Sequence, residues 1–297
     1  MSDERRPALI VGCGYVGRRL ARALKSTHNI IGVVRSESSR EELGQLGIAS
    51  ALLDLDQTRA KKFLPREFTE QAALFYFAPP PPQGLSDVRL DRFFPMVDAL
   101  PRLFVYISTT GVYGNTDGAE VDETCKVNPQ TQRAQRRVSA EDMTRVWCTE
   151  NQVRRVVLRA PGIYGPGRLP IERLQRGEPL IHAAEAGISN RIHVDDLVSA
   201  CIAAEQNTEA RGVYNVTDGN SISATEFALR VAAIAQLPVP PQISMDEARL
   251  TFTIERMSFL DESRVVSNRR MLTELGAQPK YSDVDAGIRA SLADARE

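Results

Sequence analysis

The chain has 297 residues, with 37 basic and 38 acidic side chains and a formal net charge of −1. This length suits one large α/β domain, or a domain with a smaller cap, and can bury a sizeable core. The balanced charge argues against nucleic-acid binding, because proteins of that class usually carry a basic excess. No apolar run approaches the ~20 residues that cross a bilayer, and the N-terminus lacks the apolar core of a signal peptide. We therefore expect a cytoplasmic protein with no membrane partner.

The cysteines and arginines add two further constraints. Cys13, Cys125, Cys148 and Cys201 are widely spaced and form no CxxC pair, which predicts neither a disulfide framework nor a metal site. Arginine outnumbers lysine by 32 to 5 among the basic residues. We attribute most of this excess to genome composition, although arginine also supplies forked donors suited to phosphates.

The N-terminal half alternates short apolar or β-branched runs with amphipathic stretches, which is typical of a parallel sheet with crossover helices. After about Arg159 this alternation gives way to segments rich in Gly and Pro. We predict strands at 8–11, 30–34, 51–53, 73–77, 103–107, 155–158 and 212–216, and helices at 15–25, 88–100, 133–149 and 224–236. The predicted fold is α/β: a doubly wound Rossmann sheet in residues 1–160, and a smaller C-terminal substrate lobe in residues 161–297 that returns some segments to the Rossmann core.

The first predicted strand runs into a glycine-rich loop that opens the first helix, with the sequence Gly12-Cys13-Gly14-Tyr15-Val16-Gly17. This is the context that the G-x-G-x-x-G dinucleotide motif requires. The first glycine permits a tight turn, the second lets the backbone approach a pyrophosphate, and the third lets the helix pack against the strand. The helix N-terminus then offers free N–H groups to the phosphates. We expect this loop, Tyr15 and Val16 included, to bind a nicotinamide dinucleotide; a glycine turn without a ligand is the alternative.

The second predicted strand ends at Arg35-Ser36, where an NAD enzyme would place an acid for the ribose 2′-hydroxyl. Arg35 can instead grip a 2′-phosphate, and Ser36 can add a hydroxyl donor. These residues favour NADP. NAD stays open as the alternative, because Glu37 follows two residues after Arg35.

Four later segments follow one another along the chain: Leu52-Leu53-Asp54, Phe77-Ala78-Pro79-Pro80, Ile107-Ser108-Thr109 and Ala160-Pro161-Gly162-Ile163. With the glycine loop they resemble the extended short-chain dehydrogenase/reductase superfamily, the NAD-dependent epimerases and dehydratases. The Ala-Pro-Pro variant looks most like its atypical YeeZ-like branch. The resemblance implies that Asp54 contacts adenine and that the nicotinamide side of the cofactor is lined by Ala78, Pro79, Pro80, Ser108, Pro161 and Ile163.

One departure from the family pattern concerns its catalytic pair. Family members carry Tyr-x-x-x-Lys in the helix after the active-site strand, and a Glu follows the Lys four residues later. Glu141 matches that glutamate, so counting back places Arg137 at the Lys position and Arg133 at the Tyr position. Arginine stays protonated and cannot act as a general base, but it can polarise a carbonyl or hold an anion.

The resemblance assigns three further groups of residues. Thr109 matches the Ser/Thr that hydrogen-bonds the reacting oxygen, although a hydroxyl that satisfies local backbone is the alternative. Arg168 and Arg191 fall where relatives bind a substrate phosphate, with ordinary surface salt bridges as the alternative, and Tyr113 is a further substrate-binding candidate. Thr110-Gly111 replaces the Asp-Glu of the dehydratases, which argues against sugar-nucleotide dehydration.

We therefore predict an NADP-dependent oxidoreductase or epimerase-like enzyme, with NAD as a second option. Its substrate would be a small carbonyl or hydroxyl compound, or a molecule like a sugar nucleotide. The catalytic candidates are Thr109, Arg133 and Arg137, and no metal is expected. The resemblance also implies a homodimer, because relatives pair through the helices at 88–100 and 133–149. The alternative is a cofactor-binding sensor with little or no turnover, which the loss of the Tyr/Lys pair favours.

Overall fold

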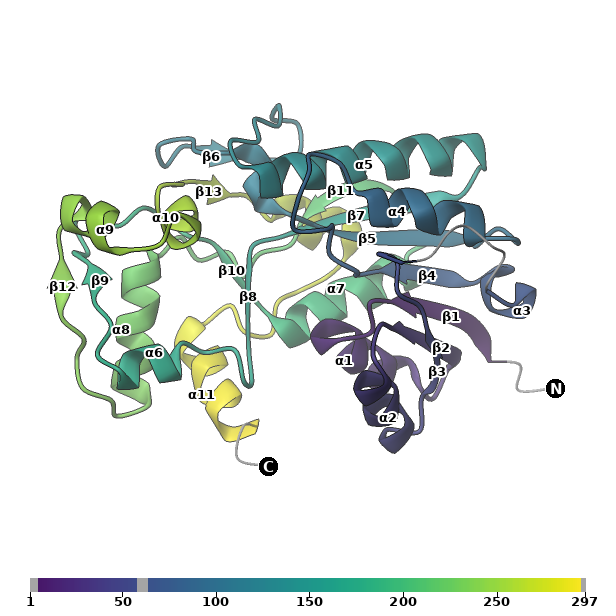
Figure 1. The fold of residues 1–297 in the computed structure, drawn as a ribbon, viewed down its shortest axis with the longest axis horizontal. Coiled ribbons are helices and arrows are strands. Elements are labelled where there is room, and N and C mark those ends of the chain that lie inside the picture. Colours follow the sequence, from purple (N-terminus) through teal and green to yellow (C-terminus); the bar gives the residue numbers. More distant parts are fainter. Residues whose placement is uncertain (1–4, 58–63, 295–297) are drawn as a thin grey trace.

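The computed structural model describes residues 5–57 and 64–294, and a seven-stranded sheet lies at its centre (Figure 1). The strand order is β11-β7-β5-β4-β1-β2-β3, and every neighbouring pair is parallel. The strands are β1 (Arg6–Val11), β2 (His28–Val34), β3 (Ala49–Leu52), β4 (Ala73–Tyr76), β5 (Leu103–Thr109), β7 (Arg154–Ala160) and β11 (Gly212–Asn215). This arrangement confirms the predicted doubly wound Rossmann fold.

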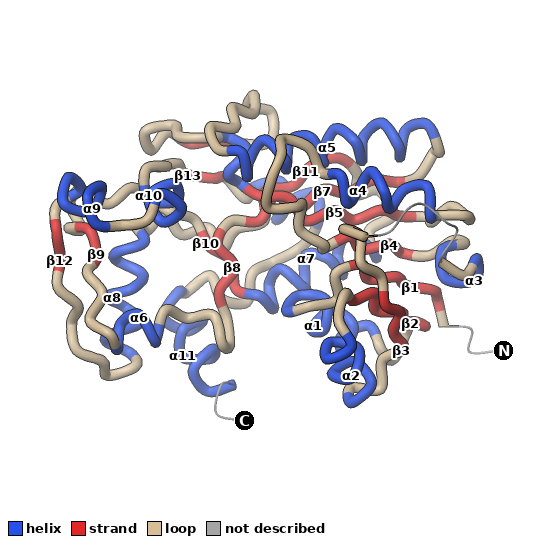
Figure 2. The backbone as a smooth tube through the Cα atoms, viewed as in Figure 1, coloured by secondary structure: helices blue, strands red, loops and turns tan. Residues whose placement is uncertain are grey.

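Helices cover both faces of the sheet, as Figure 2 shows. One face carries α1 (Tyr15–Leu24), α2 (Glu37–Gln45) and α7 (Val194–Gln206), and the other carries α3 (Arg66–Thr69), α4 (Val88–Phe93) and α5 (Gln132–Glu150). Each of these helices buries apolar side chains against the strands, so the sheet is a closed middle layer.

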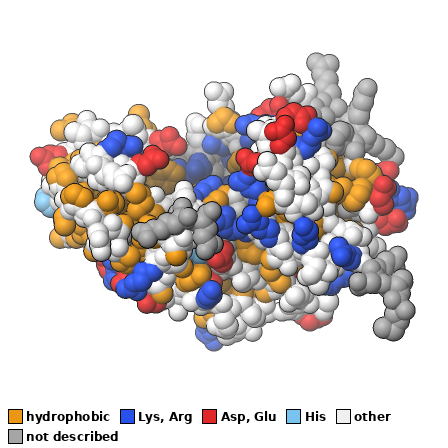
Figure 3. Space-filling view, turned by 90° about the horizontal axis from the view of Figure 1, so that it is seen from below, with side chains coloured by type: hydrophobic (Ala, Val, Ile, Leu, Met, Phe, Trp, Pro, Cys, Tyr) orange, Lys and Arg blue, Asp and Glu red, His pale blue; other side chains and the backbone are white. Residues whose placement is uncertain are grey.

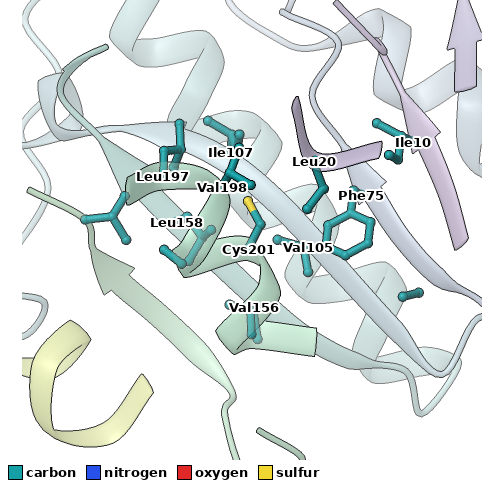
Figure 4. Packing of buried hydrophobic residues seen from close by; sticks show 14 of the residues in the cluster. Ile10, Leu20, Phe75, Val105, Ile107, Val156, Leu158, Leu197, Val198 and Cys201 are labelled. Atoms are coloured by element: carbon teal, nitrogen blue, oxygen red, sulfur yellow. The ribbon is translucent and has the colours of Figure 1, made fainter. Parts of the chain in front are cut away.

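The core is divided by the alternation of side chains along each strand. Ile10, Phe75 and Val105 face α1 and α7 (Figure 4), whereas their neighbours Leu74 and Phe104 face α4 and α5. All five side chains are fully buried. Strands that are buried on both faces read as continuous apolar runs, which is why the sequence identified them.

The C-terminal part lies beside the carboxyl ends of the strands (Figure 1). It contains two parallel two-stranded pairs, β8 (Gly162–Tyr164) with β10 (Arg191–His193) and β9 (Leu180–Ile181) with β12 (Gln242–Ile243). In a third pair, its strand β13 (Val265–Val266) lies beside β6 (Glu120–Val121), which comes from the segment between β5 and α5. Its helices are α6 (Ile171–Gln175), α8 (Ala224–Ile234), α9 (Met245–Thr251), α10 (Ile254–Leu260) and α11 (Val284–Asp294). A separate apolar cluster built around Tyr164, Phe227 and Ile288 holds this part together.

Two expectations about individual elements can be compared with the structure. The helix predicted at 88–100 was wrong in length, because α4 ends at Phe93 and a 3₁₀ turn follows at Phe94–Met96. Pro95 has no N–H for a helical hydrogen bond, and its ring obstructs the preceding turn. The strand predicted at 212–216 appears as β11, which joins the edge of the main sheet. Within the described residues, no helix is long and apolar enough to cross a membrane.

Candidate functional site

The glycine loop follows β1 at the carboxyl edge of the sheet, and each glycine has a distinct environment. Gly12 has φ +79°, and a Cβ there would lie 2.4 Å from the Ala78 backbone nitrogen. A Cβ on Gly17 would meet the Ile10 side chain at 3.0 Å, so this glycine lets α1 pack on β1. A Cβ on Gly14, by contrast, would meet nothing within 4 Å. Gly14 therefore faces open space at the N-terminus of α1, where a pyrophosphate fits.

Tyr15 lies next to this open face, between two arginines. The guanidinium carbons of Arg19 and Arg168 are each 4.3 Å from the centroid of the Tyr15 ring. The Tyr15 hydroxyl donates to the Pro166 carbonyl at 3.0 Å. The structure thus brings Arg168, which the resemblance assigns to substrate, to the first turn of the cofactor helix.

A cavity of about 200 Å³ continues from the glycine loop along the ends of β2 and β4. Arg35 and Arg89 line it together with a group of sequence-predicted residues that comprises Gly12, Asp54, Ala78 and Pro79. The Arg89 guanidinium grips Asp56 through two bonds of 2.7 and 2.5 Å, and it also donates to the Pro79 carbonyl at 2.9 Å and to that of Pro80 at 3.4 Å. These hydrogen bonds hold the pKa of Asp56 below its usual value. No local motif marks Arg89, because it reaches the cavity from α4.

Arg35 is the more loosely held of these two arginines. Its side chain is 68% exposed, and its nearest approach to Asp56 is 3.8 Å. Ser36 beside it is the N-cap of α2: its Oγ accepts from the Ser39 N–H at 3.3 Å. Arg35 and the N-terminus of α2 therefore offer positive potential at one side of the cavity.

Two neighbouring hydroxyl residues at the end of β5, Ser108 and Thr109, have different partners. Thr109 is half-buried, and its Oγ1 accepts from the Gly111 N–H at 3.1 Å. The hydroxyl therefore does satisfy local backbone, which was the alternative to a role at the reacting oxygen. Ser108 is 3% exposed and donates to Glu141 at 2.5 Å. Its hydroxyl therefore points into the interior, between β5 and α5, and not toward the cleft.

Glu141 is the centre of a buried polar network. It accepts from the Arg159 guanidinium at 3.0 and 2.7 Å, and Arg159 donates in turn to the Tyr113 hydroxyl at 2.8 Å. The Tyr113 hydroxyl donates to Asn215 at 2.9 Å, and Tyr113 is only 2% exposed. Burial raises the pKa of Tyr113 despite the nearby Arg159. The structure thus places Tyr113 inside the protein, where its hydroxyl is engaged by Arg159 and Asn215 and is not presented to a substrate.

Arg133 and Arg137 lie on α5, as the count from Glu141 predicts. Arg137 donates to the Ile107 carbonyl at 2.8 Å and to the Tyr106 hydroxyl at 3.1 Å, which ties it to β5. The guanidinium carbon of Arg133 lies 3.6 Å from the centroid of the Phe259 ring on α10. Burial lowers the pKa of Arg133 from its usual value. The two arginines therefore bridge the Rossmann sheet and the C-terminal part.

The seven tyrosines offer no evident replacement for the missing one. Five are buried, at positions 76, 106, 113, 164 and 214. The Tyr164 hydroxyl has no hydrogen-bond partner among the described residues, and burial raises its pKa. Tyr15 is bonded to Pro166, and Tyr281 packs on His193 at a ring distance of 4.1 Å.

Glu262 is a candidate that sequence reasoning missed. Its side chain is 9% exposed, and its Oε2 pairs with Arg264, which donates to the Gly114 carbonyl at 2.7 Å. The same Oε2 lies 4.0 Å from the place where a Cβ on Gly111 would be. Oε1 is buried and has no hydrogen-bond partner among the described residues. No local motif marks Glu262, because about 150 residues separate it from the strand end that it approaches.

The remaining candidates fall into two groups. Pro161 and Ile163 follow β7, and Ile163 pairs with Ile192 on β10. Arg191 lines a different cavity, in the C-terminal part, so the structure does not bring it together with Arg168.

Among the described residues, no group of three or more His, Cys, Asp or Glu could hold a metal ion.

Basic side chains gather in the hollowed middle of the face shown in Figure 3, between the Rossmann sheet and the C-terminal part. A cleft that combines an open glycine turn, a helix N-terminus and arginines suits a ligand with several phosphates. The residues present therefore fit a dinucleotide.

Comparisons with known proteins agree with this geometry. The family model "NAD dependent epimerase/dehydratase family" matches residues 95–217. A solved structure, of a functionally unknown conserved protein from Silicibacter pomeroyi DSS, is 31% identical, with a TM-score of 0.83, and the match covers 98% of this chain and all of that one. The UDP-glucuronic acid 4-epimerase from Bacillus cereus, solved in complex with NAD, has the same fold at 16% identity, with a TM-score of 0.73 over 98% of this chain and 100% of that chain.

Curated relatives match over shorter stretches. The dTDP-D-glucose 4,6-dehydratase of Homo sapiens is 25% identical over 133 residues, which are 42% of this chain and 38% of that protein. The chain therefore spans well under half the length of this relative. None of these matches tests the predicted YeeZ-like branch, which stays a prediction.

The glycine environments predict opposite outcomes for two substitutions. Gly14→Val should fold, because its Cβ meets open space, but its branches should block the pyrophosphate and abolish binding of NADPH. Gly12→Ala should instead destabilise the protein, because its Cβ would collide with the Ala78 backbone at a positive φ. Circular dichroism and thermal melting measure the fold, and NADPH fluorescence measures binding. Full NADPH binding by folded Gly14→Val would show that the loop is not the dinucleotide site.

Proposed function

Since the chain belongs to the NAD-dependent epimerase/dehydratase family, we propose that it is an NADP-dependent oxidoreductase or epimerase-like enzyme with a non-standard proton-transfer group. The observation that carries the proposal is the open face of Gly14 in the same glycine loop whose Gly12 lines the cavity with Arg35 and Arg89. The bound nicotinamide would accept or donate a hydride at the substrate carbon.

The choice of NADP rests on charge at the ribose end of the cavity. Arg35 follows β2, at the place where NAD enzymes carry an acid, and its guanidinium is exposed. Arg89 lines the same cavity, and Ser36 begins α2 beside it. A 2′-phosphate would meet these positive groups, whereas a 2′-hydroxyl would leave them unused. We assign the pyrophosphate to the glycine loop and to Arg168, which lies over Tyr15.

Chemistry without the family tyrosine requires another proton acceptor or donor. We assign that role to Glu262, because its Oε1 is buried without a partner and its Oε2 approaches Gly111. In the oxidative direction, the carboxylate would take the proton of the substrate hydroxyl. Thr109 and Arg133 would hold the substrate oxygen, and Arg137 would position the end of β5 through the Ile107 carbonyl.

A cofactor-binding sensor is the second candidate function. The observation that favours it is that Arg133 and Arg137 replace the Tyr/Lys pair and that five of the seven tyrosines are buried. A sensor would bind NADPH through the same loop and cavity but consume none of it. A turnover measurement on the cofactor-loaded protein separates the two functions.

The first prediction for this function concerns the cofactor. Wild-type protein should bind NADPH more tightly than NADH, and Arg35→Asp should weaken NADPH by about 2 kcal/mol or more, because repulsion replaces a charge-assisted contact. Arg211→Asp, at an exposed position, is the matched control and should leave both affinities unchanged. Titration calorimetry gives all six affinities. Equal affinities of the wild type for NADPH and NADH would refute the NADP assignment.

The second prediction concerns proton transfer. A panel of carbonyl compounds and sugar nucleotides should contain a substrate that consumes NADPH, and Glu262→Gln should slow its turnover by about a hundredfold or more. Glu209→Gln, at an exposed position far along the chain from these residues, controls for loss of charge, and all variants should bind NADPH normally. Tyr113→Phe and Tyr164→Phe should retain turnover. If either Phe variant loses turnover while NADPH still binds, a relocated tyrosine is the acid; if nothing in the panel consumes NADPH, the sensor function is favoured.

The third prediction concerns a homodimer, which we propose forms through α4 and α5. An open hollow of about 880 Å³ lies between these helices, and its lining includes Met143, Val146 and Trp147. Val146 is 44% exposed, so α5 presents an apolar side chain at the surface of this hollow. We expect a dimer by light scattering and a monomer for Val146→Arg. A wild-type monomer at micromolar concentration would contradict the proposal.

A further inference from the structure

A second cavity, of about 310 Å³, lies in the C-terminal part of the protein. Its lining comes from α6, β9, β10, α8 and α10 and from nearby loop residues, among them Phe252 just after α9. Phe259 belongs to this lining, and the guanidinium of Arg133 stacks on the Phe259 ring at 3.6 Å. Arg133 occupies the family's tyrosine position, so a ligand in this cavity would border the proposed reaction site.

The walls of the cavity are largely apolar. Phe227, Phe252 and Phe259 contribute rings, and most of the other lining residues are aliphatic. Of the described residues that line it, Thr225 is the one uncharged side chain with a hydrogen-bonding group, and its hydroxyl already donates to the Ile181 carbonyl at 2.8 Å. The walls therefore offer few partners for the edge of a nucleobase or for sugar hydroxyls.

Arg191 brings a buried positive charge to this apolar surface. It is 8% exposed, and its guanidinium lies 4.3 Å from the centroid of the Phe227 ring. It donates to the carbonyls of Ser189 at 2.7 Å, Ile222 at 3.3 Å and Ser223 at 3.3 Å, all of them neutral acceptors. Within the described part of the chain, Arg191 makes no direct ion pair, although the Asp218 and Glu226 carboxylates are near enough to act on its charge. An anionic ligand in the cavity would add a direct ion pair.

Arg256 and Arg173 add to this positive potential. Arg256 stacks on Phe252 at 3.3 Å and donates to the Pro179 carbonyl at 2.7 Å. It shares the Glu178 carboxylate with Arg173, at 3.7 and 2.9 Å respectively. The lining thus contains three arginines and one glutamate, a balance of +2.

We propose that this cavity is the substrate site and that its substrate is an organic acid, a carboxylate attached to a compact aromatic or branched apolar body. The body packs among the three phenylalanine rings, and the carboxylate accepts hydrogen bonds from Arg191 and Arg256. At about 310 Å³, the cavity is at the small end of the range of ligand pockets. This inference depends on the proposed function in one respect: it assumes that the bound acid is the compound that reacts beside Arg133.

Direct binding tests the inference without knowledge of the reaction. The probes are cinnamate, its neutral analogue cinnamamide, the branched acid 4-methylpentanoate and UDP-glucose, titrated into the protein with and without NADPH. Cinnamate should bind at least tenfold more tightly than cinnamamide or UDP-glucose. Arg191→Gln and Arg256→Gln should each weaken cinnamate at least tenfold, whereas Arg249→Gln, an equal loss of charge on the exposed side of α9, should change it less than twofold. Arg191 ties three carbonyls together, so Arg256→Gln carries the test if Arg191→Gln fails to fold.

Two results would overturn the inference. One is that neither acid binds to folded, NADPH-saturated protein. The other is that UDP-glucose binds more tightly than cinnamate and loses its affinity in Arg256→Gln, which would assign the cavity to a nucleotide sugar. NADPH affinity, measured on the same samples, reports on the proposed function separately. Acid binding to a protein that fails to bind NADPH would refute the cofactor assignment and leave the organic-acid site standing.

Discussion

A buried ion pair determines how helix α5 lies on the sheet. Glu141 on α5 receives two hydrogen bonds from Arg159 on β7 and a third from Ser108 on β5. A buried pair of this kind adds little net stability, but any shift of the helix that broke it would leave charge uncompensated. The pair therefore favours one register. That register places Arg137 and Arg133, one and two turns earlier, at the end of β5 and against the C-terminal part.

Arg133 and Arg137 replace the family's Tyr/Lys pair, but the buried network around Glu141 that positions α5 is present. The network extends from Arg159 through Tyr113 to Asn215 on β11, so α5 is coupled to three strands of the sheet. Such a frame holds the end of β5 in place whichever residue carries the proton. The carboxylate that approaches this end, Glu262, comes from the C-terminal part, so the proposed reaction site is complete only where the two parts meet.

Local sequence patterns predicted the parts of the structure that depend on local physics. The strands buried on both faces produced continuous apolar runs, and the glycine loop appeared between a strand and a helix, where positive φ at Gly12 and close packing at Gly17 require glycine. The positions of Arg133 and Arg137 on α5 came instead from the family resemblance, through the match of Glu141 to the family's glutamate. The length of α4 was not predicted correctly. The apolar pattern continues past Pro95, but the backbone cannot continue as an α-helix through that proline.

Contacts between distant segments were beyond the reach of those patterns. Ser108 and Tyr113 both lie in the segment that resembles an active-site strand, yet their hydroxyls turn into the Glu141 network. Which way a strand-end side chain points depends on its partners, and those partners are Glu141 and Arg159, on α5 and β7. Arg89 was missed for the same reason, because only the packing of α4 on the sheet brings it to the end of β2.

The many arginines show most clearly that composition alone does not reveal the role of a residue and that its contacts in the structure are needed. Many of the arginines have a structural role that the sequence cannot distinguish from a binding role. Arg154, for example, donates to the carbonyls of Ala204, Asn207 and Ala210 and so caps the end of α7. Arg191 makes a similar set of hydrogen bonds to carbonyls, but it does so on the wall of a cavity. The difference between a structural arginine and a ligand-binding one is therefore the open space beside the guanidinium, which only the folded structure shows.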